Sequence, residues 1–254
     1  MLHISKQLLR SAPAPAPAPR AGFAPDWPAL LAQQAETARH PALQHYYRAG
    51  VPDAATPISE VPLLAMDFET TGLNTRRDDI VSIGLIPLSL TRIRLSESVH
   101  WILNPRADLR HESVVIHGIT HATVAHAPDL SERLLKLLTM MAGRVMVVHH
   151  RGIEQHFLNA ALQRRIGEGI IFPCIDTLAL EGLLCQHAPV SRLRKLWRGS
   201  ARPSLCLPES RARYHLPHYP AHNALTDALG CAELLQAQCA HHFPPQTPLR
   251  ELWC

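Results

Sequence analysis

Short apolar runs separated by polar turns fill the middle of the chain. The runs at residues 62–68, 80–86 and 99–103 have the length of buried strands, and the segments between them are short. Short connections favour antiparallel pairing, because two parallel neighbours need a long crossover between them. This part of the pattern therefore predicts three antiparallel strands.

Beyond residue 129 the apolar spacing becomes that of helices. Residues 130–141 carry Leu and Met three or four positions apart, and Gly143 follows at a C-cap position. Strands and helices then alternate, with strands predicted at 145–149 and around Ile175 and helices at 153–166, 177–185 and 223–239. Three antiparallel strands followed by this alternation predict an α/β fold, in which helices flank a mixed sheet.

The two ends of the chain have a different pattern. Residues 12–20 alternate Ala with Pro, which predicts an extended, polyproline-like spacer. Residues 27–47 have apolar positions near helical spacing, interrupted by Pro41, which indicates one or two short helices. We therefore divide the chain into an N-terminal extension, a domain and a loose C-terminal tail, at residues 1–60, 61–242 and 243–254.

Composition narrows the class of protein. The chain has 254 residues, of which 46% are hydrophobic and 18% charged, as in a globular protein with one well-developed domain. Its formal charge of +4 permits a nucleic-acid partner without requiring one. The six cysteines form no C-x-x-C pair, and no apolar run approaches the roughly eighteen residues of a membrane span. We expect reduced cysteines, no membrane association and a cytoplasmic location.

Two acidic residues end the first predicted strand, in the segment LLAMDFETTGL. Asp67 and Glu69 are two positions apart, so both carboxylates project from the same face of the strand. Two carboxylates this close repel one another unless a cation lies between them, and oxygen ligands suit Mg²⁺ or Mn²⁺. The pair therefore indicates a metal site, although an ordinary exposed strand end remains an alternative.

A second candidate begins the last predicted helix, in the segment HNALTDALG. With Asn223 as the N-cap, His222 lies just before the helix and reaches the same end of it as Asp227. An imidazole beside a metal-bound water is a suitable general base. Taken alone, such a segment is more often an exposed His in front of an ordinary capped helix.

Taken together, these segments resemble the DnaQ-like DEDDh family of 3′–5′ exonucleases, which belongs to the ribonuclease H-like superfamily and includes polymerase proofreading subunits. The resemblance extends from about residue 63 to residue 238. It includes DFETTGL, IHGIT, VMVVHHRGIEQHFL, IDTLAL and HNALTDA, in the family's order. It implies a ribonuclease H-like mixed sheet.

The resemblance also implies a role for each matching residue. Asp67, Glu69 and Asp227 would bind two divalent metal ions, Mg²⁺ or Mn²⁺, and His222 would deprotonate the attacking water. The two ions would lie about 3.5–4 Å apart and stabilise the incoming and leaving oxygens at the scissile phosphate. Residues expected to contact the terminal nucleotide are Thr70, Thr71, Gly72, His117, Ile119, His149 and His150.

The second motif departs from the family's pattern. It reads HHRGIE where the family has His-Asn-Ala, one further residue and Phe-Asp, so that Glu154 stands at an Asp position. Glutamate keeps the charge and the ligand type and is one methylene longer, so we retain Glu154 as a metal ligand and catalytic residue. The alternative is a solvated helix residue in a slow or inactive enzyme.

Three further segments have weaker signals. Asp176 is predicted to be a helix N-cap and not a catalytic acid. The Arg-rich residues 191–214 either follow a nucleic-acid backbone or form a solvated face. The tail segment QTPLREL is faintly similar to sliding-clamp-binding peptides, which leaves association with a polymerase or a clamp open.

These observations predict a metal-dependent 3′–5′ exonuclease that acts on the 3′ ends of single-stranded DNA in repair or proofreading and releases nucleoside 5′-monophosphates. One alternative is an enzyme that trims RNA or short oligonucleotides. Another is a weakly active, polymerase-associated nucleic-acid-binding module. The motifs do not separate DNA from RNA, because the sugar 2′-position is recognised by the shape of a pocket.

Overall fold

A mixed sheet forms the centre of the molecule. The computed structural model describes residues 25–187 and 203–254. The strands lie in the order β3-β2-β1-β5-β6, and β4 also pairs with β2. They are β1 (Leu63–Thr70), β2 (Ile80–Ser89), β3 (Arg92–Ile93), β4 (Val99–Ile102), β5 (Val145–Val148) and β6 (Cys174–Asp176).

The pairing confirms the predicted α/β fold. β2 is antiparallel to β1, β3 and β4, whereas β5 is parallel to both β1 and β6. Three antiparallel strands therefore precede the parallel ones, as expected. The additional strand β3 has only two residues, too few to produce a periodic signal in the sequence.

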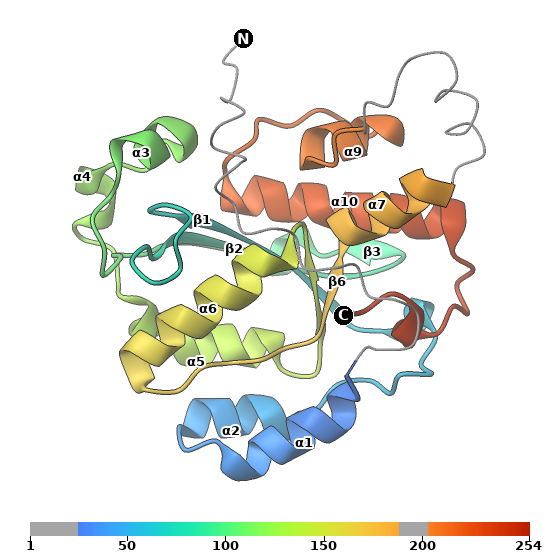
Figure 1. The fold of residues 1–254 in the computed structure, drawn as a ribbon, viewed down its shortest axis with the longest axis horizontal. Helices are drawn as coiled ribbons and strands as arrows, with labels where there is room; N and C mark the ends of the chain where they lie inside the picture. The colour runs from blue at the N-terminus through green and yellow to red at the C-terminus, as the bar shows by residue number, and fades with distance from the viewer. Residues whose placement is uncertain (1–24, 188–202) are drawn as a thin grey trace.

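Helices flank the sheet, with α10 on one side and α5 and α6 on the other (Figure 1). Asp129 and Glu132 form a capping box at the start of α5, and Gly143 follows its end with φ 70°. The helices are α1 (Trp27–Thr37), α2 (Pro41–Arg48), α3 (His111–His117), α4 (His121–Val124), α5 (Leu130–Met141), α6 (Arg151–Ile166), α7 (Thr177–His187), α9 (Leu207–Arg213) and α10 (Ala224–His242).

The N-terminal helices pack on the rest of the protein. The chain forms two helices, and the second begins at Pro41, as the interrupted pattern predicted. Leu31, Tyr46 and Tyr47 are buried in the same hydrophobic core as the sheet, and α2 contacts α5. The Ala-Pro spacer at residues 12–20 lies outside the described residues.

The expected loose C-terminal tail is wrong. Trp253 is 2% exposed and forms a bridge with Ile175 of β6, and Cys254 exchanges backbone hydrogen bonds with Cys174 at 2.8 and 3.4 Å. Burying such a side chain stabilises the fold by about 2–3 kcal/mol. Leu249, in QTPLREL, is also fully buried. This segment is therefore not free to bind a clamp as an extended peptide.

Buried ion pairs fix the loop between β1 and β2. Asp79 and Arg165 are both 1% exposed and lie 2.7 Å apart, and Arg165 also contacts Asp129, the N-cap of α5, at 3.1 Å. Burial alone would raise the pKa of Asp79, but the hydrogen bonds from Arg165 and from backbone N–H groups lower it. The loop that follows the acidic strand end is thus tied to α5 and α6.

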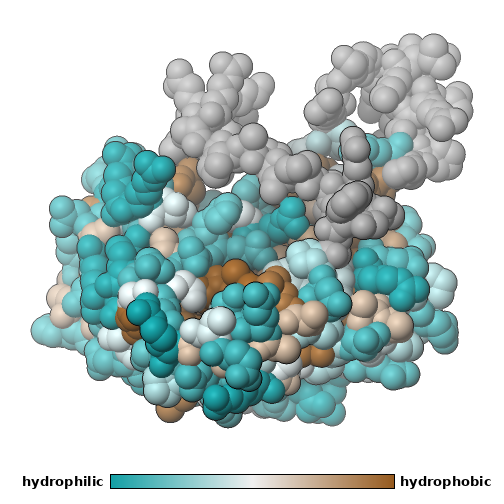
Figure 2. Space-filling model, turned by 60° about the horizontal axis from the view of Figure 1, so that its bottom comes forward, coloured by the Kyte–Doolittle hydropathy of each residue, from teal (hydrophilic) through white to brown (hydrophobic). Residues whose placement is uncertain are grey.

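The face drawn in Figure 2 shows little sign of a large apolar contact. Figure 2 shows a face that is mostly hydrophilic, with one apolar area near its centre. Such small areas are ordinary on soluble domains. Within the described part of the chain, the structure contains no helix of the length and hydropathy required to span a bilayer.

Candidate active site

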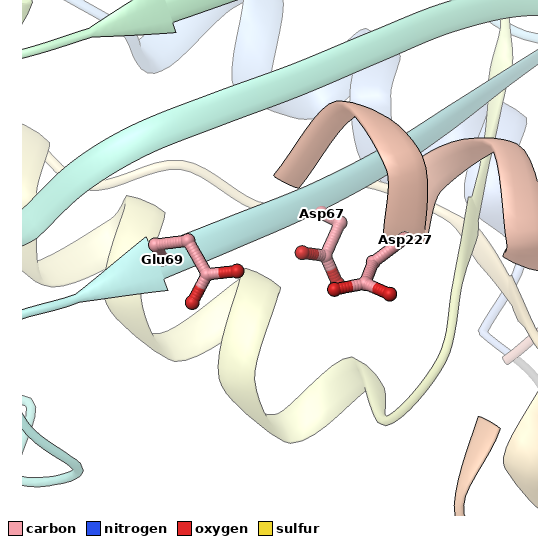
Figure 3. Close-up of side chains that lie close together, drawn as sticks. All are labelled: Asp67, Glu69 and Asp227. Carbon is pink, nitrogen blue, oxygen red and sulfur yellow. The ribbon is translucent and has the colours of Figure 1, made fainter. Parts of the chain in front are cut away.

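Three carboxylates converge where β1 meets the start of α10. Asp67 and Glu69 project from β1 and Asp227 from the first turn of α10, and one oxygen of each lies within 4.8 Å of the others (Figure 3). The alternation of side chains along a strand places the first two on one face. We call these three residues the acidic centre.

Gly84 allows α10 to approach the acidic strand. It lies opposite Asp67 in the β1–β2 pairing, and a Cβ atom there would overlap the backbone of Ala224 and Leu225, which open α10. The helix therefore rests directly on β2, which brings Asp227 to Asp67. Sequence reasoning missed Gly84, although a glycine inside an apolar strand is a known sign of close backbone approach.

His222 lies beside the acidic centre. Its backbone N–H donates to Oδ2 of Asp227 at 2.7 Å, and the N–H of Asn223 donates to the same atom at 3.2 Å. The side chain of Asn223 caps α10 by accepting from the N–H of Thr226 at 3.1 Å. His222 thus occupies the position just before the cap that the sequence predicted.

Burial and mutual repulsion raise the pKa values of the acidic centre. Burial raises the pKa of Asp67 well above its usual value, and the charges of Glu154, Glu69 and Asp227 raise it further. Burial, with the charge of Asp227, raises the pKa of Glu69 to about 8. Ionising Glu69 in the metal-free protein therefore costs about 5 kcal/mol more than ionising a glutamate in water. A cation would offset this cost, so the centre fits a metal ion.

Glu154 is not the solvated residue that one alternative required. It lies in the first turn of α6, is 2% exposed, and contributes to the raised pKa of Asp67. Its Oε2 has no hydrogen-bond partner among the described residues. A buried carboxylate oxygen without a partner is costly, and a bound cation would satisfy it. Glu154 nevertheless lies outside the group of three that meets within 4.8 Å.

Asp176 holds the helix that carries Glu154. Its carboxylate accepts from Leu178 and Ala179 at the start of α7, which confirms the predicted N-cap. It also accepts from the N–H groups of His150 and Arg151, at 3.0 and 3.1 Å, at the start of α6. One carboxylate thus fixes two helices, and the sequence had indicated only one of them.

The turn after β1 and the end of α3 lie beside the acidic centre. The hydroxyl of Thr70 donates to the carbonyl of Gly72 at 2.7 Å, and the N–H of Ile119 donates to Nδ1 of His117 at 3.0 Å. Burial lowers the pKa of His117, the backbone of Thr70 raises it, and His222 lowers it. The segments that contain Thr70, His117 and His222 therefore come together, as expected from the motifs.

Two of the expected nucleotide-contacting residues have side chains whose polar atoms contact the protein. Thr71 is fully buried, and its hydroxyl accepts from the N–H of Asp79 at 3.0 Å. His149 uses both ring nitrogens within the protein, at 2.9 Å from Thr177 Oγ1 and 2.9 Å from the carbonyl of Leu205. Burial lowers the pKa of His149 to about 4. Both ring nitrogens of His149 are therefore already occupied by protein groups.

His150 differs from its neighbour. It precedes α6 with φ 97°, a left-handed conformation, and its Nδ1 is buried with no hydrogen-bond partner among the described residues. The start of α6 therefore contains a buried ring nitrogen whose hydrogen-bonding capacity is unused among the described residues.

Comparisons with known proteins agree with this geometry. The profile of the RNase T exonuclease family matches residues 64–235. A DNA polymerase III subunit epsilon-like protein of Rhodobacter capsulatus is 30% identical over 71% of the chain, which spans only 24% of that relative's length. The DNA polymerase III subunit epsilon of Treponema pallidum is 26% identical to this chain. The aligned region covers 72% of this chain and 78% of the length of that subunit.

Solved structures share the fold at lower identity. Exonuclease X in complex with 5′ overhanging duplex DNA has a TM-score of 0.54 and 19% identity, over 74% of this chain and 98% of its own. The nuclease domain of 3′hExo, a DEDDh family member bound to rAMP, has a TM-score of 0.56 and 15% identity. The match covers 75% of this chain and 96% of that structure's chain. At these identities the likeness concerns the fold alone.

The metal-free protein should lose stability as the pH rises. The folded-state pKa of Glu69, about 8, lies above its usual 4.5, so its stabilising contribution is complete below about pH 4.5 and is lost as the pH rises through about 8. In EDTA, Glu69→Gln should flatten the fall in unfolding free energy between about pH 5 and about pH 8 by up to about 1.4 kcal/mol per pH unit. Urea unfolding measures this slope.

Glu112→Gln is the control, because Glu112 is at an exposed position of α3, and it should keep the wild-type slope. An unchanged slope in Glu69→Gln would contradict the prediction.

Gly84→Ala should weaken metal binding. The added methyl group would push the start of α10 off β2 and separate Asp227 from Asp67. We expect the Mn²⁺ concentration for half-maximal thermal stabilisation to rise at least about tenfold. The matched control is Gly182→Ala in α7, where a Cβ would meet only Leu205 Cδ1, at 3.4 Å. Equal Mn²⁺ affinities for both variants would show that the close approach does not matter.

Proposed function

The chain belongs to the RNase T exonuclease family, and from this premise we propose that it is a metal-dependent 3′–5′ exonuclease of the DnaQ-like type. The observation that carries the proposal is the acidic centre, with three carboxylate oxygens within 4.8 Å of one another. Next to it lies the buried Glu154, whose Oε2 has no hydrogen-bond partner among the described residues. Acids with raised pKa values gather more often at functional sites than elsewhere, and a metal-dependent nuclease requires such a group.

The acidic centre would hold the divalent ions. Asp67, Glu69 and Asp227 are the proposed ligands, with Glu154 as a fourth, and carboxylate oxygens suit Mg²⁺ or Mn²⁺. Two bound ions would neutralise the scissile phosphate and lower the pKa of a water molecule. The unpaired oxygen of Glu154 and the raised pKa values of Asp67 and Glu69 support this assignment.

His222 is the proposed general base. Its N–H contact with Asp227 holds it beside the acidic centre, where its ring can accept a proton from the attacking water. The water oxygen then bonds to phosphorus, and the bond from phosphorus to the 3′-oxygen of the preceding nucleotide breaks. That 3′-oxygen takes up a proton, and the terminal residue leaves as a nucleoside 5′-monophosphate.

Five residues are proposed to contact the terminal nucleotide. They border the acidic centre from the turn after β1, from the end of α3 and from the start of α6: Thr70, Gly72, His117, Ile119 and His150. Thr71 and His149, whose polar atoms contact the protein, are proposed to support this pocket without contacting the nucleotide.

Single-stranded DNA with a free 3′ end is the proposed substrate, and repair or proofreading in association with a polymerase is the proposed setting. The support is that the relatives at 30% and 26% identity are named for DNA polymerase III subunit epsilon. The structural relatives include one with DNA and one with rAMP, so trimming of RNA or short oligonucleotides stays the alternative substrate.

One observation favours a second candidate function. Glu154 replaces the family's Asp, and its carboxylate lies outside the group of three that meets within 4.8 Å. A misplaced fourth ligand would slow hydrolysis and leave binding intact. The second candidate is therefore a polymerase-associated module that binds nucleic acid with weak activity.

The wild-type protein should shorten labelled single-stranded DNA from its 3′ end. A time course on matched 5′-labelled and 3′-labelled DNA and RNA, with Mg²⁺, Mn²⁺ or EDTA, measures direction, substrate and metal dependence. Asp67→Ala should lower the rate at least about 100-fold, because it removes a ligand shared by the whole centre. Glu36→Ala, an exposed acid of α1, should retain the wild-type rate. No cleavage of either polymer in Mn²⁺ would reject the proposed activity.

Glu154→Asp separates the two candidate functions. If Glu154 is adapted to this site, shortening the side chain draws its carboxylate away, and the rate should stay level or fall up to about tenfold. The measurement is kcat on the preferred substrate, with the Mn²⁺ affinity determined in parallel. A gain of more than about tenfold would instead favour the weakly active binding module.

A further inference from the structure

A buried arginine of α9 connects three parts of the protein around the loop of residues 214–223, which carries His222. Arg211 is 4% exposed. Its guanidinium donates to the carbonyl of Gly230 in α10 at 2.7 Å and to the carbonyl of Pro217 in the loop at 2.8 Å. It also forms an ion pair with Glu233 of α10 at 2.7 Å.

Tyr219 completes this connection. Its ring lies 4.6 Å from Cζ of Arg211, in cation–π contact, and its hydroxyl donates to Oε1 of Glu233 at 3.0 Å. Arg211 and Tyr219 therefore share the carboxylate of Glu233. We call these three residues the arginine staple; it fastens the middle of the loop to α9 and α10.

The backbone of this loop is strained, so side-chain contacts are needed to hold its conformation. His215 and His222 have φ values of 56° and 68°, in the left-handed region that non-glycine residues rarely adopt. Strained conformations persist only where surrounding contacts enforce them. At the far end of the loop, the N–H of His222 is held by Asp227.

The middle of the loop is not closely packed against the helices. A cavity of about 50 Å³ lies between α9, α10 and the loop, and Arg211, Tyr219 and Asp227 are among the residues that line it. Tyr214 holds the start of the loop, because its hydroxyl donates to Glu181 at 3.0 Å and its ring packs on His241. The staple holds the middle of the loop, at Pro217 and Tyr219. Arg211 thus holds the part of the loop that precedes His222.

We propose that Arg211 is a positioning residue, which sets the place of His222 relative to the acidic centre through the arginine staple. This inference rests on the proposed function, in which His222 is the general base. Lysine cannot take over this role, because one ammonium group lacks the planar fork that reaches Gly230, Pro217 and Glu233 together.

Arg211→Lys should lower kcat on single-stranded DNA at least about tenfold, with KM and the Mn²⁺-induced rise in Tm close to wild type. The metal ligands stay in place, so only the step that uses His222 is affected. Tyr219→Phe keeps the ring and removes one hydrogen bond, so it should have a smaller effect in the same direction. Arg213→Lys is the matched control, because Arg213 lies in the same helix and pairs instead with Glu181, at 2.6 Å; it should retain the wild-type kcat.

A double-mutant cycle with His222→Ala separates positioning from general destabilisation. If Arg211 acts through His222, Arg211→Lys should not slow the His222→Ala variant any further. An additional loss as large as in the wild-type background, or an equal loss in Arg213→Lys, would overturn the proposal.

Hydrogen–deuterium exchange tests the staple without using activity. Peptides that span residues 214–223 should exchange at least about tenfold faster in Arg211→Lys than in wild type, while peptides from β1 and β5 stay unchanged. Unchanged exchange in the loop would overturn the proposal even if the enzyme is active. If the wild-type protein cleaves no substrate, the proposed function fails, and the exchange result alone decides whether Arg211 holds the loop.

Discussion

Repulsion between buried and half-buried carboxylates is the constraint on which the site depends. Asp67, Glu69 and Asp227 come from two elements far apart in the sequence, and Glu154 approaches them from a third. Burial raises the pKa values of all four, so the metal-free protein gains nothing from gathering them. Cations bound between these carboxylates would replace the repulsion with attraction, so the arrangement suits a metal-binding centre.

The surrounding structure supplies the force that keeps these acids together. Gly84 lets α10 lie on β2, Asp176 fastens the first turn of α6, and Arg165 ties the loop after β1 to α5 and α6. Each of these three residues lies outside the acidic centre and holds a different element of the fold. A stable hydrophobic core of sheet and helices can therefore hold an unfavourable charge group in place, which is the usual relation between stability and function in enzymes.

Much of the fold could be predicted, because it depends on local periodicity. The apolar runs, the stripe of α5 and the break at Pro41 predicted every strand except β3, and the helices α1, α2, α5, α6, α7 and α10, within a few residues. The short helices α3, α4 and α9 were not predicted, because each has too few turns to show a periodic apolar stripe. The two-residue strand β3 and the docked tail could not be predicted in this way. Trp253 is buried because β6 and the core lie beside it in space, and nothing in a short Pro-containing segment indicates that neighbour.

The sequence by itself determined the chemistry available: the acidic pair on one face of β1, the capped start of α10 with Asp227, and the family to which these motifs are similar. Only the tertiary structure decided which groups are buried or already occupied. In the folded protein, Glu154 is buried with one oxygen that has no hydrogen-bond partner among the described residues. Both ring nitrogens of His149 contact protein groups, and Arg211 forms the arginine staple with Tyr219 and Glu233. The first kind of information depends on residue type and spacing along one segment. The second depends on contacts between segments distant along the chain, which local pattern does not encode.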